Sequence, residues 1–100
     1  MIRDYTETAE IKTTGETVTV LRRASILHDQ AIMTALERTG CFVIGTPYGF
    51  RYRRPNKRNF TRPARDAVFI VKDDAVTATL PGPYFYAHYQ VIACCSRCTH

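Results

Sequence analysis

A single helical segment is the feature that most limits how this chain can fold. Between Ser25 and Gly40, apolar residues recur at the three- and four-residue spacing of an amphipathic helix: Leu27, Ala31, Ile32, Ala35 and Leu36. Serine is a favoured N-cap residue, and glycine suits the left-handed position that ends a helix. We therefore predict a helix over residues 26–39, with its apolar stripe on a sheet and His28 facing solvent.

The rest of the chain alternates apolar and polar residues between turn-forming residues, which is typical of strands. Two such segments flank Gly15 and predict a hairpin. Pro81-Gly82-Pro83 interrupts the pattern, and the long segment after it predicts the last strand. The expected strands cover residues 7–13, 16–23, 41–44 (fully apolar), 50–53, 67–71, 76–80 and 84–95.

The order of these elements is β-β-α-β-β-β-β. The connections between strands are too short for crossovers, so sequential antiparallel pairing is expected. The sequence therefore predicts an α+β fold and a single domain over residues 1–100. We expect a mostly antiparallel, six- to seven-stranded curved sheet or open barrel with one amphipathic helix.

Positive charge is concentrated in the middle of the chain. The net charge is +5, and residues 41–60 alone contribute five cations and no acidic residue. We call residues 47–66 (PYGFRYRRPNKRNFTRPARD) the basic arm, and its first acidic residue is its last, Asp66. Residues 55–66 lack periodicity and predict an exposed basic loop. If residues 50–53 form a strand, Phe50 and Tyr52 share one face and the arginines share the other.

Guanidinium groups bind phosphate oxygens in pairs, and aromatic rings stack on unpaired bases. The arm therefore predicts a small non-enzymatic module that binds nucleic acid, such as RNA, or another polyanion such as an acidic protein surface. The alternative is that Phe50 and Tyr52 are core residues and the arginines only a solvated face. The expected anion-binding residues are Arg51, Tyr52, Arg53, Arg54, Lys57, Arg58, Arg62 and Arg65.

Two other functions stay open. The acidic N-terminal hairpin and the basic middle would pair head to tail in a self-associating structural protein of viral or mobile-element origin, or the chain would dock on a partner protein. Alternatively, His88 beside the arginines would form a metal-independent ribonuclease site. The usual enzyme signatures, such as a Walker loop, are missing, and no small-molecule substrate is evident.

Three of the four cysteines lie in the last seven residues. Cys95 and Cys98 have zinc-knuckle spacing, and His100 would be a third ligand, with Cys94 or Cys41 as the fourth. The alternatives are a disulfide or redox role for Cys95 and Cys98, or a C-terminal tail over residues 96–100 that binds no cofactor. Free or metal-bound thiols indicate a reducing compartment. With no signal segment and no membrane-spanning run, we expect a cytoplasmic protein, in a host cell if it is viral.

Overall fold

The computed structural model describes residues 2–94, which form an α+β fold of seven strands and one main helix. Within these residues the strands form two antiparallel sheets, ordered β6-β5-β2-β1-β7 and β3-β4, and neither sheet closes into a barrel. The elements in chain order are η1 (Ile2–Tyr5), β1 (Glu7–Ile11), β2 (Thr17–Arg22), α1 (Ile26–Arg38), β3 (Phe42–Thr46), β4 (Gly49–Arg53), β5 (Val68–Lys72), β6 (Ala75–Leu80), α2 (Gly82–His88) and β7 (Tyr89–Ala93).

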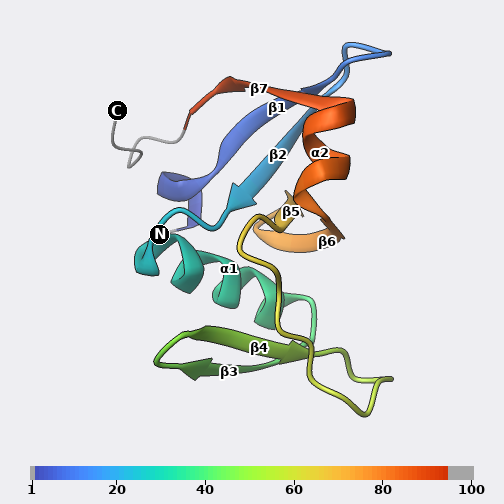
Figure 1. The fold of residues 1–100 in the computed structure, drawn as a ribbon. Coiled ribbons are helices and arrows are strands. Elements are labelled where there is room, and N and C mark those ends of the chain that lie inside the picture. Colours follow the sequence, from blue (N-terminus) through green and yellow to red (C-terminus); the bar gives the residue numbers. More distant parts are fainter. Residues whose placement is uncertain (1, 95–100) are drawn as a thin grey trace.

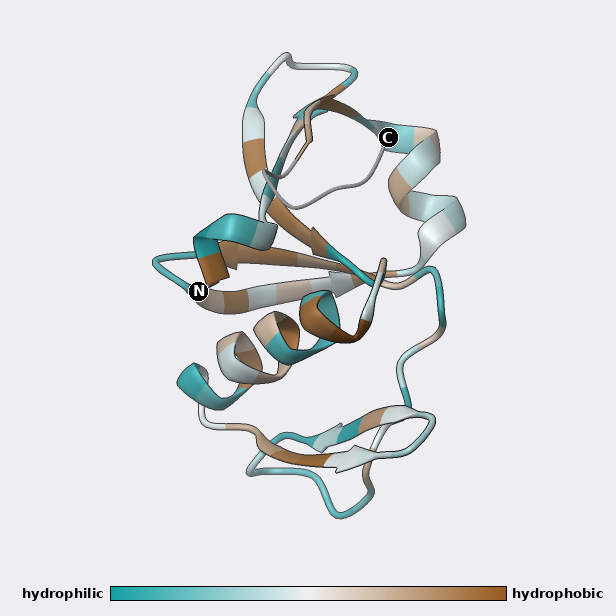
Figure 2. Ribbon diagram, turned by 90° about the vertical axis from the view of Figure 1, so that its left-hand side faces the viewer, coloured by the Kyte–Doolittle hydropathy of each residue, from teal (hydrophilic) through white to brown (hydrophobic). Residues whose placement is uncertain are grey.

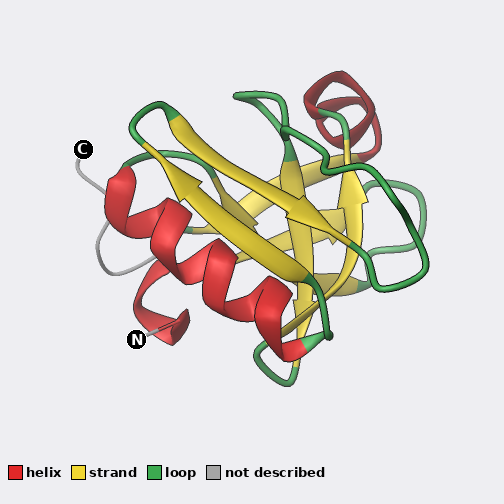
Figure 3. Ribbon diagram, turned by 90° about the horizontal axis from the view of Figure 1, so that it is seen from below, coloured by secondary structure: helices red, strands yellow, loops and turns green. Residues whose placement is uncertain are grey.

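The predicted fold class is confirmed, but the strands divide differently from the expected single sheet. Figure 1 shows the five-stranded sheet above α1 and the β3–β4 hairpin below it. Seen from below, the hairpin and α1 lie in front of the sheet (Figure 3), and α1 contacts both. The hairpin that carries the basic arm is therefore a separate layer, joined to the sheet through α1 and a shared core.

Helix α1 has the ends that the sequence predicts. The side chain of Ser25 accepts a hydrogen bond from the backbone N–H of His28, and Gly40 follows the last turn with φ +90°. One part of the prediction is wrong: Leu27 is 54% exposed, and His28 is buried in its place. The His28 ring packs on Tyr5, and its Nδ1 lies 2.7 Å from the Ser25 hydroxyl.

The predicted strand over residues 84–95 is wrong in its first half, where the structure has helix α2. Proline is favoured in the first turn of a helix, so Pro83 lies in the first turn of α2 rather than separating two strands. Helical spacing brings the ring of Tyr84 against His88 and stacks Phe85 on Tyr89, with ring centroids 4.4 and 5.0 Å apart. Phe85 is fully buried against the sheet.

Helix α2 also changes the pairing of the last strand. It carries the chain across the sheet, so β7 pairs with β1 rather than with its neighbour in sequence, β6. The expected sequential pairing holds for β1–β2, β3–β4 and β5–β6, whereas β2 pairs with β5. The sheet is consequently covered by α1 on one face and by α2 on the other, which explains why β5 is apolar on both faces.

Gly82 is required where α2 begins beside the end of the arm. A Cβ at this position would lie 2.6 Å from Cγ and 2.7 Å from Cβ of Asp66. Gly82→Ala is therefore expected to lower the free energy of unfolding by about 1–3 kcal/mol, measured by urea denaturation. Gly45→Ala is the control, because its Cβ would meet only Met33 Sδ at 4.0 Å. Equal losses in the two variants would contradict the steric explanation.

Candidate nucleic-acid interface

Strand β4 divides the aromatic and basic residues of the arm between two faces. Phe50 and Tyr52 are 2% and 7% exposed, and their rings pack on Phe69 with centroids 6.3 and 6.4 Å away. Arg51 and Arg53 lie on the outer face, as the alternation predicts. Because the ring of Tyr52 belongs to the core, it cannot stack on a base. We therefore remove Tyr52 from the expected contact residues.

Two outer-face residues were missed by the sequence analysis, which treated residues 41–44 as uniformly apolar. Phe42 and Ile44 are 53% and 50% exposed, and they lie opposite Arg53 and Arg51 in the β3–β4 register. A two-stranded hairpin buries only one face, so every second residue of an apolar strand remains exposed. The sequence does contain a sign of this exposure. Arg51 and Arg53 alternate along β4, which follows β3 after a short turn, so the β3 residues that pair with them share their solvent-facing side. Figure 2 shows the apolar colour of β3 beside the hydrophilic loop that follows β4.

The loop after β4 is exposed from Arg54 to Asp66 except at Pro63, yet it is held to the body of the protein at three points. Tyr52 and Thr61 exchange two backbone hydrogen bonds of 3.0 and 2.7 Å. Arg53 Nη1 donates to the carbonyl of Lys57 at 2.7 Å. Arg23 Nη1 donates to the carbonyls of Pro63 and Ala64 at 2.9 and 3.2 Å. These contacts fix the path of the loop before any ligand is bound.

The arginines fall into two groups that the sequence did not separate. Arg22 and Arg23 have structural roles: each forms a two-pronged ion pair, with Glu7 and Asp29 respectively. The hydrogen bond to Glu7 raises the pKa of Arg22 above its already high value. By contrast, no carboxylate within residues 2–94 lies at ion-pair distance from the seven cations of the arm. These are Arg51, Arg53, Arg54, Lys57, Arg58, Arg62 and Arg65.

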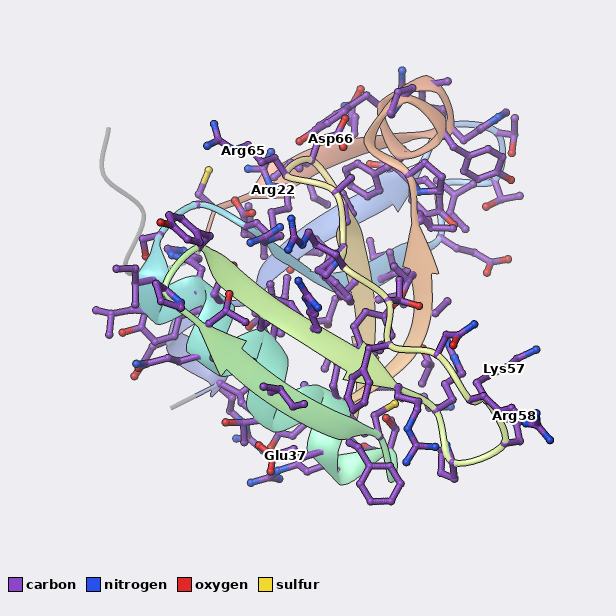
Figure 4. The ribbon with its side chains drawn as sticks, turned by 60° about the horizontal axis from the view of Figure 1, so that its bottom comes forward. Arg22, Glu37, Lys57, Arg58, Arg65 and Asp66 are labelled. Atoms are coloured by element: carbon purple, nitrogen blue, oxygen red, sulfur yellow. The ribbon has the colours of Figure 1, made fainter. Side chains whose placement is uncertain are left out.

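Five of the seven arm cations line two hollows toward opposite ends of β4, whereas Arg51 and Arg53 line neither of them. The tip hollow has a volume of about 320 Å³ and is lined by Tyr52, Arg54, Lys57, Arg58, Asn59 and Thr61. The turn hollow, of about 380 Å³, includes Tyr48, Arg62 and Arg65. Figure 4 shows Lys57 and Arg58 reaching outward from the tip of the loop, with Arg65 at its other end. A five-residue strand such as β4 separates its ends by about 13 Å.

Three exposed rings accompany these cations. Tyr48, at the hairpin turn, is 94% exposed, and Phe60, in the loop, is 39% exposed. Phe60 and Phe42 lie beside Arg53, and Tyr48 lies with Arg62 and Arg65 around the turn hollow. Exposed aromatic rings can stack on any of the four bases, while neighbouring cations contact the phosphates.

The structure does not bring the histidines of the described residues to the arm. His88 ends α2, which packs on the opposite face of the sheet from the hairpin (Figure 1). His28 is buried beside Ser25 and Tyr5. The arrangement that a ribonuclease site would need, a histidine among the arm arginines, is therefore not formed by residues 2–94.

The zinc prediction falls largely outside the described residues, because Cys95, Cys98 and His100 all lie beyond residue 94. Of its proposed fourth ligands, Cys94 is exposed, whereas Cys41 is buried with its Sγ 3.6 Å from the Thr39 hydroxyl. Within residues 2–94 no three metal-ligating side chains gather around one point. A zinc site in the C-terminal segment stays a prediction.

No known protein family, curated protein or solved structure matches this chain. In the described part of the chain, no helix has the length and apolar character needed to cross a membrane. Function has to be inferred from the arm itself.

Proposed function

We propose that the protein is a small, non-enzymatic module that binds single-stranded nucleic acid along the outer face of the β3–β4 hairpin and the adjoining loop. The observation that carries this proposal is a set of seven cations with no carboxylate partner among residues 2–94, beside exposed aromatic rings. Phosphates would contact the six exposed cations of the arm, which are Arg51, Arg54, Lys57, Arg58, Arg62 and Arg65. Bases would stack on the free ring faces of Phe42, Tyr48 and Phe60.

A single strand fits this surface better than a duplex does. Stacking on side-chain rings requires unpaired bases, which a duplex hides within its own stack. The loop is also ordered by its contacts with Tyr52, Arg53 and Arg23. A surface ordered in advance loses less conformational entropy on binding, which favours affinity.

The proposal is tested by fluorescence anisotropy with a labelled 12-nucleotide single strand, the same sequence as a duplex, and polyglutamate. If the six exposed cations of the arm contact phosphates, log Kobs should fall against log salt with a slope of about −4. The single strand should bind more tightly than the duplex. Equal affinity for polyglutamate would make the arm a general polyanion surface. No binding at 50 mM salt would refute the proposal.

A second candidate function, self-assembly, is favoured by the free edge of β3. Within residues 2–94, β3 pairs only with β4, and its sequence FVIGT contains no charge and no proline. Charged residues and proline normally protect an edge strand, because an edge without them can pair with a strand of another chain. For head-to-tail pairing through the acidic N-terminal hairpin, Glu7 is not available, because it is buried in its ion pair with Arg22, whereas Glu16 at the hairpin turn is exposed.

Ile44→Lys tests assembly through β3. If β3 edges pair, the wild-type protein should sediment as a dimer at about 100 μM, and a lysine beside the edge should shift it to a monomer. Leu27→Lys is the control, because Leu27 is similarly exposed (54%, against 50% for Ile44) but lies on a helix. A wild-type protein that is monomeric at every concentration would exclude this function.

A further inference from the structure

Arg53 differs from the other cations of the arm in its contacts. Its guanidinium carbon lies 4.5 Å from the ring centroid of Phe42 and 5.5 Å from that of Phe60. Its Nη1 donates a 2.7 Å hydrogen bond to the carbonyl of Lys57. The side chain of Arg53 thus contacts a ring of β3, a ring of the loop and a backbone carbonyl of the loop. It is also only partly exposed, whereas Arg51 and Arg54 are exposed.

We propose that Arg53 is a positioning residue rather than a ligand contact. It holds residues 54–60 over the hairpin in the conformation that presents Arg54, Lys57 and Arg58. Its effect on ligand binding rests on the function proposed above, but its effect on the loop does not. The position of the guanidinium also assigns one face each of Phe42 and Phe60 to Arg53 and leaves their other faces for bases.

The chemistry of the guanidinium explains why arginine is needed. Its planar, delocalised group stacks on aromatic rings while its in-plane N–H groups donate hydrogen bonds. The ammonium of lysine is a compact, strongly hydrated charge that cannot do both. Within residues 54–60 the backbone also forms a local turn, in which the N–H of Lys57 donates to the carbonyl of Arg54. Loss of the Arg53 contacts should therefore release the tip as far as Thr61, where the backbone pairs with Tyr52 again.

Arg51 provides a matched control on the same face of the same strand. It lies opposite Ile44 in the hairpin register, and within the described residues it stacks on no ring. Arg53→Lys and Arg51→Lys leave the net charge unchanged. Phe60→Leu removes one of the two rings without touching any charge, and it serves as a second variant if Arg53→Lys fails to fold.

The first measurement uses no ligand. Limited proteolysis with trypsin reports how often the backbone after Lys57 and Arg58 opens. Cleavage at these sites should be roughly five-fold faster in Arg53→Lys and in Phe60→Leu than in the wild type, and unchanged in Arg51→Lys. Equal cleavage rates in the Arg53→Lys and Arg51→Lys variants, with thermal unfolding also equal, would overturn the positioning role.

The second measurement is binding of the 12-nucleotide single strand. Arg53→Lys should weaken binding by roughly five-fold, whereas Arg3→Lys, at an exposed arginine of η1 outside the arm, should weaken it by less than two-fold. Both substitutions keep the charge, but only Arg53→Lys releases the loop. If the tip loosens and no variant binds nucleic acid, the positioning role stands and the proposed function fails. If all variants bind equally and the tip does not loosen, the function stands and the positioning role fails.

Discussion

Replacing Arg54, Lys57 and Arg58 together by glutamine is expected to reduce the salt slope of single-strand binding by about 2, because each phosphate contact contributes about 0.7. If the variant and the wild type bind equally at 1 M salt, this smaller slope makes binding by the variant about 50-fold weaker at 0.15 M salt. The three side chains line the tip hollow and have no carboxylate partner within residues 2–94. Anisotropy titrations between 50 and 200 mM salt measure both quantities.

The matched control removes the same amount of charge elsewhere. Arg3, Arg38 and Lys72 are exposed cations on η1, α1 and β5, outside the arm. Their triple change to glutamine lowers the net charge by the same three units but removes no expected phosphate contact. Its salt slope should stay close to that of the wild type. If the two triple variants lose affinity equally, the long-range field of the whole molecule attracts the strand and the arm has no special role.

Local patterns predicted most of the fold. The α1 cap residues, Ser25 and Gly40, act within one helical turn, so the sequence alone located both helix ends. Helix α2 was missed because its strongest stabilising contact is long-range: Phe85 packs on β-strands that are distant in sequence. The aromatic residues of α2 alternate with other residues in a pattern that also suits a strand. Burial of Phe85 against the sheet favours the helix over the strand. The aromatic pairs four residues apart, Tyr84 with His88 and Phe85 with Tyr89, were the available helical signal.

The candidate site was predicted in its charge but not in its geometry. A run of cations is visible in any sequence, whereas the partners of an arginine depend on contacts between distant segments. Arg23 binds the carbonyl of Pro63, which is 40 residues away, and so belongs to the framework of the arm. Arg53 belongs to that framework as well. Exposure of Phe42 likewise follows from the separation of the hairpin from the main sheet, which no local pattern reveals.

Arg22→Met is expected to destabilise the protein more than any other single change considered above. Arg22 Nε and Nη2 donate to the two carboxylate oxygens of Glu7 at 2.6 and 2.8 Å, and the Glu7 side chain is only 3% exposed. Arg22 Nη1 also donates to the hydroxyl of Tyr86 on α2 at 2.9 Å. Removing the guanidinium would deprive the buried Glu7 carboxylate of its ion pair and its two hydrogen bonds with Arg22. The expected loss is about 3 kcal/mol of the free energy of unfolding.

Urea denaturation of three variants separates the ion pair from other effects of the substitution. Replacing both partners, Glu7→Leu with Arg22→Met, should recover most of the loss, because no buried charge remains to be desolvated. Arg38→Met should cost less than about 1 kcal/mol, since its 3.7 Å contact with Asp74 is half-exposed. Faster amide exchange in α2 of the Arg22→Met variant would show that Arg22 also anchors that helix through Tyr86. A double variant no more stable than Arg22→Met alone would contradict this account, because the loss would then come from packing of the arginine stem rather than from the buried carboxylate.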